Sequence, residues 1–238
     1  MSDFVEAIFH VNQVLADDHL PPISIGIESG AAVYRSDDFR RTDKKGREQL
    51  ARRGWRYDEE FGGYLAPFAY CVGTPDHACD QVPQQLGVRP DDVRTLRCPV
   101  CGTIYPFIQF ARDVMAVAPP DLLVATTESL NNRLIASEYQ YLFGTSAFCA
   151  PSVVMLDEIH LQTSTAGTQV ALLLRRLLAR VRLGKQERGD TANLAFVGLS
   201  ATIAGPRAFL SEVSGLPAQN IREVRPHEDE LEVIGAER

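Results

Sequence analysis

The fold is decided by three apolar segments that each run into polar residues: LLVATTES at 122–129, VVMLDEIH at 153–160 and LAFVGLSAT at 194–202. Each apolar run has the length of a buried strand. Helical patterns follow the three runs, at residues 128–143, 166–183 and 206–214. Strands that alternate with helices predict an α/β fold with a mostly parallel sheet covered on both faces.

Two more elements are predicted before these segments. Apolar residues recur at helical spacing in residues 1–16, which predicts an amphipathic helix. Acids at Asp3 and Glu6 interrupt this stretch, so it does not have the pattern of a signal peptide. Residues 23–27 alternate towards a short strand that ends in a turn.

Length and composition describe an ordinary globular chain. Its 238 residues suit one large domain, or a domain of about 150 residues with a sizeable insertion. Hydrophobic residues at 45% and charged residues at 23% exclude wholesale disorder. A formal net charge of −7 argues against a generic polyanion binder. With no run of about 18 apolar residues, we expect a cytoplasmic protein without a membrane partner.

An acidic loop follows the second apolar run. Asp157, Glu158 and His160 stand where open α/β sheets bind ligands, beyond the carboxyl end of a strand. One carboxylate suits Mg²⁺, which keeps several of its waters, and the next carboxylate can orient or deprotonate an attacking water. The alternative is an ordinary polar loop in which His160 is solvated or caps a helix.

Two further polar loops accompany the acidic one. Ser200 and Thr202 follow the third apolar run, and Thr126 and Thr127 follow the first. Hydroxyl groups at strand ends can contact phosphates or neighbouring loops, although each pair alone could simply cap a helix. The three loops are much more specific together than any one of them is alone.

In this order the segments resemble motifs Ib, II and III of superfamily 2 helicases of the DEAD/DEAH type. The resemblance covers about residues 119–217 and, more weakly, 1–30. Asp-Glu-Ile-His followed by Gly167 and a Leu-Leu-Leu-Arg-Arg-Leu helix is most similar to large bacterial helicases with a zinc-binding region. The helicase subunit of DISARM phage-defence systems is one of these.

The resemblance implies a RecA-like fold and ATP hydrolysis coupled to movement on DNA or RNA, with DNA favoured. It implies that Asp157 holds Mg²⁺ through water and that Glu158 activates the hydrolytic water. His160 would link the nucleotide site to motif III, in which Ser200 and Thr202 couple hydrolysis to strand movement.

The motif Ib resemblance implies that Thr126 and Thr127 contact the nucleic-acid backbone. The family usually has Pro where this chain has Glu128, and a carboxylate beside a phosphate path is unfavourable.

The sequence contains no G-x-x-x-x-G-K-[ST] phosphate loop and no second RecA-like domain. We therefore expect part of a motor that is inactive alone. The chain is then either a fragment of a longer helicase or a subunit whose remaining motor portion is supplied by a partner chain. The expected domains are the start of a partial RecA-like domain at 1–34, an insertion at 35–118, the motif-bearing part at 119–222, and a linker towards a missing second RecA-like domain at 223–238.

Four of the five cysteines cluster within the expected insertion: Cys71, Cys79, Cys98 and Cys101. Cys98-Pro-Val-Cys101-Gly has the form of a zinc knuckle. Structural Zn²⁺ would stabilise a subdomain that is too small to fold stably by itself. His77 could replace one ligand. The alternatives are four buried free thiols or a dithiol redox site. We expect Cys149 to be a core residue.

A basic stretch lies beside the cysteines. Residues 35–56 hold nine basic and four acidic side chains, including the candidate nucleic-acid contacts Arg40, Arg41, Lys44 and Lys45. Trp55 and Tyr57 are available for base stacking. The alternatives are a solvated helix face or a disordered loop.

The cysteine cluster and the basic stretch together suggest a second functional hypothesis, a non-catalytic subunit that is stabilised by zinc and binds nucleic acid or a partner. A zinc hydrolase is disfavoured because no H-E-x-x-H occurs.

Overall fold

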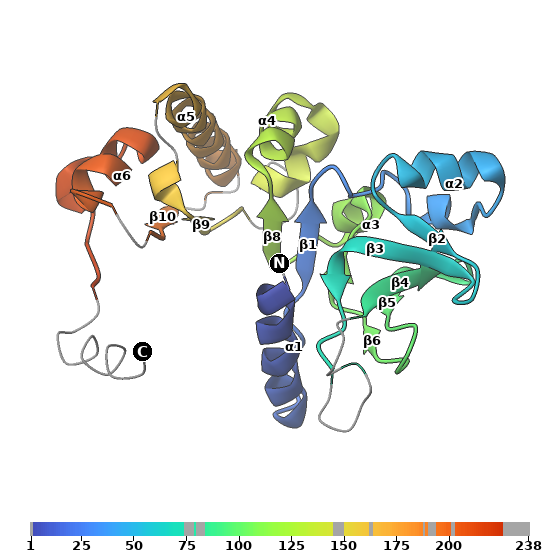
Figure 1. The fold of residues 1–238 in the computed structure, drawn as a ribbon. Helices are drawn as coiled ribbons and strands as arrows, with labels where there is room; N and C mark the ends of the chain where they lie inside the picture. The colour runs from blue at the N-terminus through green and yellow to red at the C-terminus, as the bar shows by residue number, and fades with distance from the viewer. Residues whose placement is uncertain are drawn as a thin grey trace. The chain divides into compact units, whose positions relative to one another are not determined.

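The computed structural model describes residues 2–73, 79, 84–144, 150–161, 164–187, 189, 194–200 and 203–225 (Figure 1). The chain divides into two compact units, Met1–Tyr139 and Gln140–Arg238. Both combine helices with parallel β-strands, so the expected mixed α/β class is confirmed.

A parallel three-stranded sheet of order β7-β1-β8 lies in the first unit. The central strand β1 (Ile25–Glu28) is buried along its whole length. It pairs with β7 (Ile108–Gln109) on one side and with β8 (Leu122–Ala125) on the other. The strands expected near 23–27 and 122–126 are confirmed, since the short apolar runs there do form the sheet.

An antiparallel five-stranded sheet of order β2-β3-β4-β5-β6 fills much of the rest of the first unit (Figure 1). Val93 and Leu96 of β5 are buried and belong to the hydrophobic core. The strand bounds are β2 Arg56–Asp58, β3 Gly63–Tyr70, β4 Gln85–Arg89, β5 Asp92–Arg97 and β6 Ile104–Tyr105.

The helices of the first unit flank these sheets. The expected N-terminal helix is confirmed as α1 (Ser2–Asp17), which buries Val5 and Ile8. The side chain of Asn12 fixes it to the lead into β1 through two hydrogen bonds with the backbone of Ile23, at 2.9 and 2.7 Å. The remaining helices are η1 Ser36–Arg40, α2 Lys44–Ala51, α3 Arg112–Val117, α4 Thr127–Ile135 and, at the boundary between the units, η3 Ser137–Phe143.

One hydrophobic core joins both sheets of the first unit, and Trp55 lies in it. This side chain is 1% exposed, packs edge-on against Phe39, and donates a hydrogen bond from Nε1 to the Ala31 carbonyl at 2.8 Å. The expectation that Trp55 is available for base stacking is therefore wrong. Tyr57 stays half-buried, with the Arg47 guanidinium 3.6 Å from its ring centroid.

The second unit contains a parallel strand pair, β9 (Val153–Leu156) and β10 (Ala195–Gly198). The long helix α5 (Ser164–Glu187) packs against α6 (Pro206–Ser214). The buried apolar face of α5 is the one that the sequence pattern predicts: Val170, Leu173, Leu174, Leu177, Leu178 and Val181. The short helices are η4 Ile159–Leu161 and η5 Ala218–Asn220.

The helix expected over 128–143 is wrong in its extent. Helix α4 ends at Ile135 because Ala136 adopts an extended conformation, with φ −88° and ψ 125°. A 3-10 segment with a kink at Tyr139 then covers the remainder. Within the part of the chain that the structure describes, no helix has the length and apolar character needed to cross a membrane.

Candidate functional site

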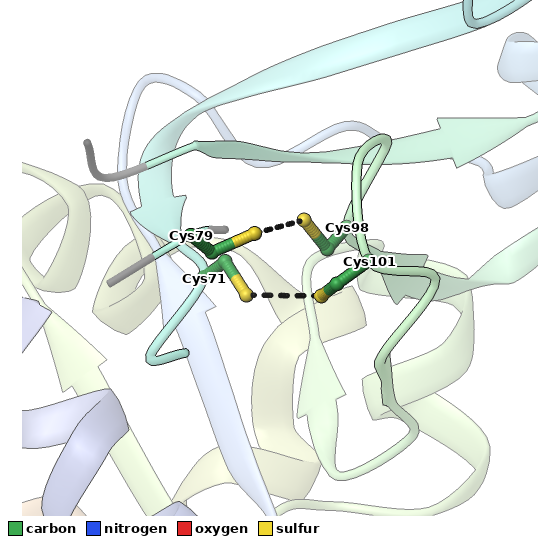
Figure 2. Close-up of side chains that lie close together, drawn as sticks. All are labelled: Cys71, Cys79, Cys98 and Cys101. Carbon is green, nitrogen blue, oxygen red and sulfur yellow. Dashed lines mark hydrogen bonds between the residues drawn. The ribbon is translucent and has the colours of Figure 1, made fainter. Parts of the chain in front are cut away.

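Four cysteine side chains point towards one another at one end of the antiparallel sheet (Figure 2). Cys71 directly follows β3, and Cys98 directly follows β5. Both strands run antiparallel to β4, so their carboxyl ends lie at the same end of the sheet. Cys101 follows in the turn towards β6. Cys79 completes the cluster from beside Cys71, facing Cys98 (Figure 2).

The sulfur positions have the spacing of a metal-ligand set. Sγ of Cys71 lies 3.6 Å from Sγ of Cys101, Sγ of Cys79 lies 3.5 Å from Sγ of Cys98, and all four lie within 4.8 Å of one another. Tetrahedral zinc with Zn–S bonds of about 2.3 Å places its sulfurs about 3.8 Å apart. The four residues are free thiols, and their cluster could hold a metal ion such as zinc.

The turn that holds Cys98 and Cys101 has backbone features of a zinc knuckle. The Gly102 N–H donates to the Cys98 carbonyl at 3.1 Å, and the Cys98 N–H donates to the Thr103 carbonyl at 2.9 Å. Gly102 has a φ of +75°, in the left-handed region that favours glycine. Gly102 therefore allows the chain to make the tight turn after Cys101 without strain.

Two hydroxyl groups contact the sulfurs from outside the cluster. The Tyr105 hydroxyl donates to Sγ of Cys71 at 3.3 Å and accepts a hydrogen bond from the Val72 N–H at 3.0 Å. The Thr103 hydroxyl lies 3.1 Å from Sγ of Cys101. Such contacts orient metal ligands in proteins. Sequence reasoning missed both residues, and their only signal is that they closely follow the Cys-x-x-Cys-Gly turn.

The surroundings give the thiols unequal acidity. Burial raises the pKa of Cys71 and of Cys79, because a thiolate is poorly solvated in the core. Burial also acts to raise the pKa of Cys101, but hydrogen bonds from Thr103 and from neighbouring thiols lower that pKa to about 6. A divalent cation would offset the repulsion between four thiolates held this close together.

The acidic loop lies in the second unit, where η4 begins two residues after Asp157. The N–H of Glu158 donates to Oδ1 of Asp157 at 3.0 Å, and Glu158 has a left-handed φ of +47°. Nδ1 of His160 lies 3.2 Å from Oε2 of Glu158 and 3.1 Å from Oγ of Ser200. The structure thus brings Glu158, His160 and Ser200 together at the carboxyl ends of β9 and β10.

The first unit contains the remaining candidate contacts. Thr126 is the N-cap of α4, where its hydroxyl accepts from the Ser129 N–H at 3.2 Å, and Thr127 is the first residue of that helix. The candidate basic residues Arg40, Arg41, Lys44 and Lys45 are all exposed. Arg40 also donates from Nε to Asp37 at 3.0 Å and from Nη1 to the Pro90 carbonyl at 3.1 Å. Thr202, His77 and Cys149 lie outside the described residues.

A buried ion cluster at the carboxyl end of β1 is absent from the sequence expectations. Glu28 is fully buried, and the Arg112 guanidinium contacts both of its oxygens at 2.8–3.1 Å. Arg133 donates to the same carboxylate at 3.0 Å. The signal in the sequence is a single acid at the end of an apolar strand.

Comparison of the chain with models of protein families, with curated proteins and with solved structures finds no match.

Proposed function

We propose that this chain supplies part of the motor domain of an ATP-dependent nucleic-acid helicase or translocase of the DExH type. The contacts of His160 support the proposal most directly. This side chain lies between the carboxylate of Glu158 and the hydroxyl of Ser200, which come from loops 42 positions apart. In the helicase resemblance, these loops are motifs II and III. Their contact gives a path by which a change at the carboxylate can reach the second loop.

The parallel strands support a RecA-like arrangement in the same proposal. The acidic loop directly follows β9, the hydroxyl loop directly follows its partner β10, and Thr126 directly follows β8. In open α/β folds, ligands bind beyond the carboxyl ends of such strands. Each of the three loops that the sequence singles out therefore leaves a parallel strand at a position suited to binding.

The donor set fits a hydrated Mg²⁺ ion but only part of a nucleotide site. Asp157 and Glu158 offer hard oxygen ligands at a strand end, and the Glu158 side chain is 57% exposed. A bound Mg²⁺ would neutralise phosphate charge. Glu158 would then accept a proton from an attacking water, and His160 would orient that carboxylate. The 238 residues contain no phosphate-binding loop, so the proposal requires this loop from another polypeptide segment.

The test begins by sequencing the DNA that flanks this reading frame, and continues with reconstitution of the chain with a phosphate-loop polypeptide that this DNA encodes. We expect nucleic-acid-stimulated ATP turnover from the mixture, and loss of turnover with Glu158→Gln. The matched control is Glu223→Gln, which makes the same change in the second unit 65 positions after Glu158 in the sequence. Turnover that is unaffected by Glu158→Gln would refute the assignment of this residue.

A second candidate function is a zinc-stapled module that binds nucleic acid, with DNA favoured, or a partner. The four-cysteine cluster and the exposed side chains of Arg40, Arg41, Lys44 and Lys45 favour it. Phosphate contacts from such side chains make affinity fall with salt. We expect Lys44→Glu with Lys45→Glu to weaken binding of a labelled single strand and to reduce its salt dependence.

The matched control for the second candidate is Arg207→Glu with Arg222→Glu, which makes the same charge change at exposed sites of the second unit. DNA binding that survives Glu158→Gln but fails after Cys98→Ser would favour the module over the motor. Equal loss of binding in both charge-reversed pairs would contradict a contact at Lys44 and Lys45. Oligonucleotides of DNA and RNA, tested side by side, distinguish the two nucleic acids.

A further inference from the structure

A hollow of about 600 Å³ lies on the antiparallel sheet, beside the tip of the cysteine turn. Its apolar lining comes from Phe61, Leu65, Tyr70 and Val100, and Val100 is 56% exposed at that tip. The carboxylates of Asp58 and Glu60 complete one side. A volume of this size accommodates a short peptide or a small ligand.

The ring of Phe61 forms a platform in this hollow. A Cβ atom placed on Gly87 would lie 2.4 Å from Cε1 of Phe61, and one placed on Gly63 would lie 2.8 Å from it. The ring therefore rests on the backbone of β3 and β4, where no side chain intervenes. The Phe61 N–H donates to Oδ1 of Asp58 at 2.9 Å, which holds the turn that presents the ring. Because Phe61 is only half-buried, part of its surface faces the hollow.

The charges of the lining favour a cation. Nη1 of Arg56 lies 3.5 Å from Oδ2 of Asp58, so these two charges offset each other. Glu60 is exposed and makes no ion pair with any residue that the structure describes. The lining therefore carries one net negative charge beside aromatic rings, a combination that attracts a cation and repels phosphate.

We propose that this hollow binds an arginine-bearing peptide segment of a partner protein. The methylene groups of the arginine would contact Leu65 and Val100, and its guanidinium would stack on Phe61 within reach of Glu60. A planar guanidinium stacks on a ring better than an ammonium group does, which favours arginine over lysine. The net negative charge separates this surface from the exposed basic residues of η1 and α2, which suit a nucleic-acid backbone.

The experiment is a titration of the ¹⁵N-labelled full chain, followed by backbone amide shifts. The probe is acetyl-Leu-Arg-Leu-amide, and the comparison ligands are acetyl-Leu-Glu-Leu-amide and a short oligothymidylate. We expect saturable shifts around the hollow from the arginine peptide alone. Glu60→Lys should weaken this binding roughly tenfold, and Phe61→Leu should weaken it while keeping an apolar side chain on the sheet.

The matched control is Glu138→Lys, which makes the same charge change at an exposed position of the first unit. It should leave the affinity for the arginine peptide unchanged. Equal weakening by Glu60→Lys and Glu138→Lys would overturn the proposal, as would the absence of shifts at the hollow in a chain whose spectrum is native. Shifts at the hollow from oligothymidylate, without shifts from the peptide, would show a nucleic-acid contact and would also overturn it.

Discussion

Loss of a metal ion from the four-cysteine cluster should destabilise the first unit, and for an ion that stays bound to Cys71 and Cys101 in the unfolded chain the amount is set by loop closure. Cys71 and Cys101 are 30 positions apart, so an ion bound to both closes a loop of that length. Closure of such a loop removes about 4 kcal/mol of conformational freedom from the unfolded chain. For a unit of this size, that difference corresponds to a melting temperature roughly 10–15 °C lower.

The assay compares zinc content and thermal unfolding of the native chain and Cys98→Ser. Metal-free protein is prepared by unfolding in chelator and refolding. We expect one zinc per native chain, and a melting temperature that falls on metal removal and recovers when zinc is added. Cys98→Ser should melt at the lower temperature with or without zinc, whereas Cys149→Ser should keep one zinc per chain. A native chain whose melting is indifferent to zinc would refute the reasoning.

Three further changes probe other contacts. Tyr105→Phe removes the hydroxyl that contacts Cys71 and should weaken zinc binding roughly tenfold in a chelator competition, while the fold persists. Glu28→Gln leaves two arginine charges buried without their carboxylate and should lower the free energy of unfolding by about 3–5 kcal/mol in urea titrations. Hydrogen bonds from the side chain and backbone of Ser24 lower the pKa of Asp121. The stabilisation that these hydrogen bonds give is therefore present above the pKa of Asp121 in the unfolded chain, and it is lost as pH falls through the lower pKa of Asp121 in the folded chain. Asp121→Asn should therefore lower stability at pH 7 by less than about 1 kcal/mol, and this effect should shrink progressively as pH falls below the unfolded-state pKa, as paired unfolding curves would show.

Much of the parallel architecture could be predicted from the sequence. Continuous apolar runs predicted β8, β9 and β10 as strands. The expectation that both faces of these strands are covered is wrong, because side chains such as Val153 (52% exposed) and Met155 (62% exposed) are exposed. The long helix after the acidic loop was predicted because its apolar residues recur at 3.6-residue spacing. The end of α4 was missed, since the helical pattern continues past Ile135 while the backbone turns extended at Ala136.

The candidate sites also differ in how far the sequence could predict them, because some join residues that are close in the chain and others join residues that are far apart. Cys98 and Cys101 were predicted as a ligand pair because a two-residue spacing lets both thiolates reach one ion. The sequence could not reveal the contacts of Glu28, whose partners Arg112 and Arg133 lie 84 and 105 positions away. It misled at Trp55 because a neighbouring basic stretch suggested an exposed stacking surface. The ring instead binds the carbonyl of Ala31, which only the folded chain brings near.

The burial of the cysteine sulfurs has a kinetic consequence. Cys98 is 1% exposed and Cys79 is 3% exposed, and both belong to the core that joins the two sheets of the first unit. A chelator in solution can reach such sulfurs only after the core opens. Exchange of bound zinc for a labelled isotope should then proceed no faster than hydrogen exchange of the most protected amides of β5, and the ion would remain in place for as long as the unit stays folded.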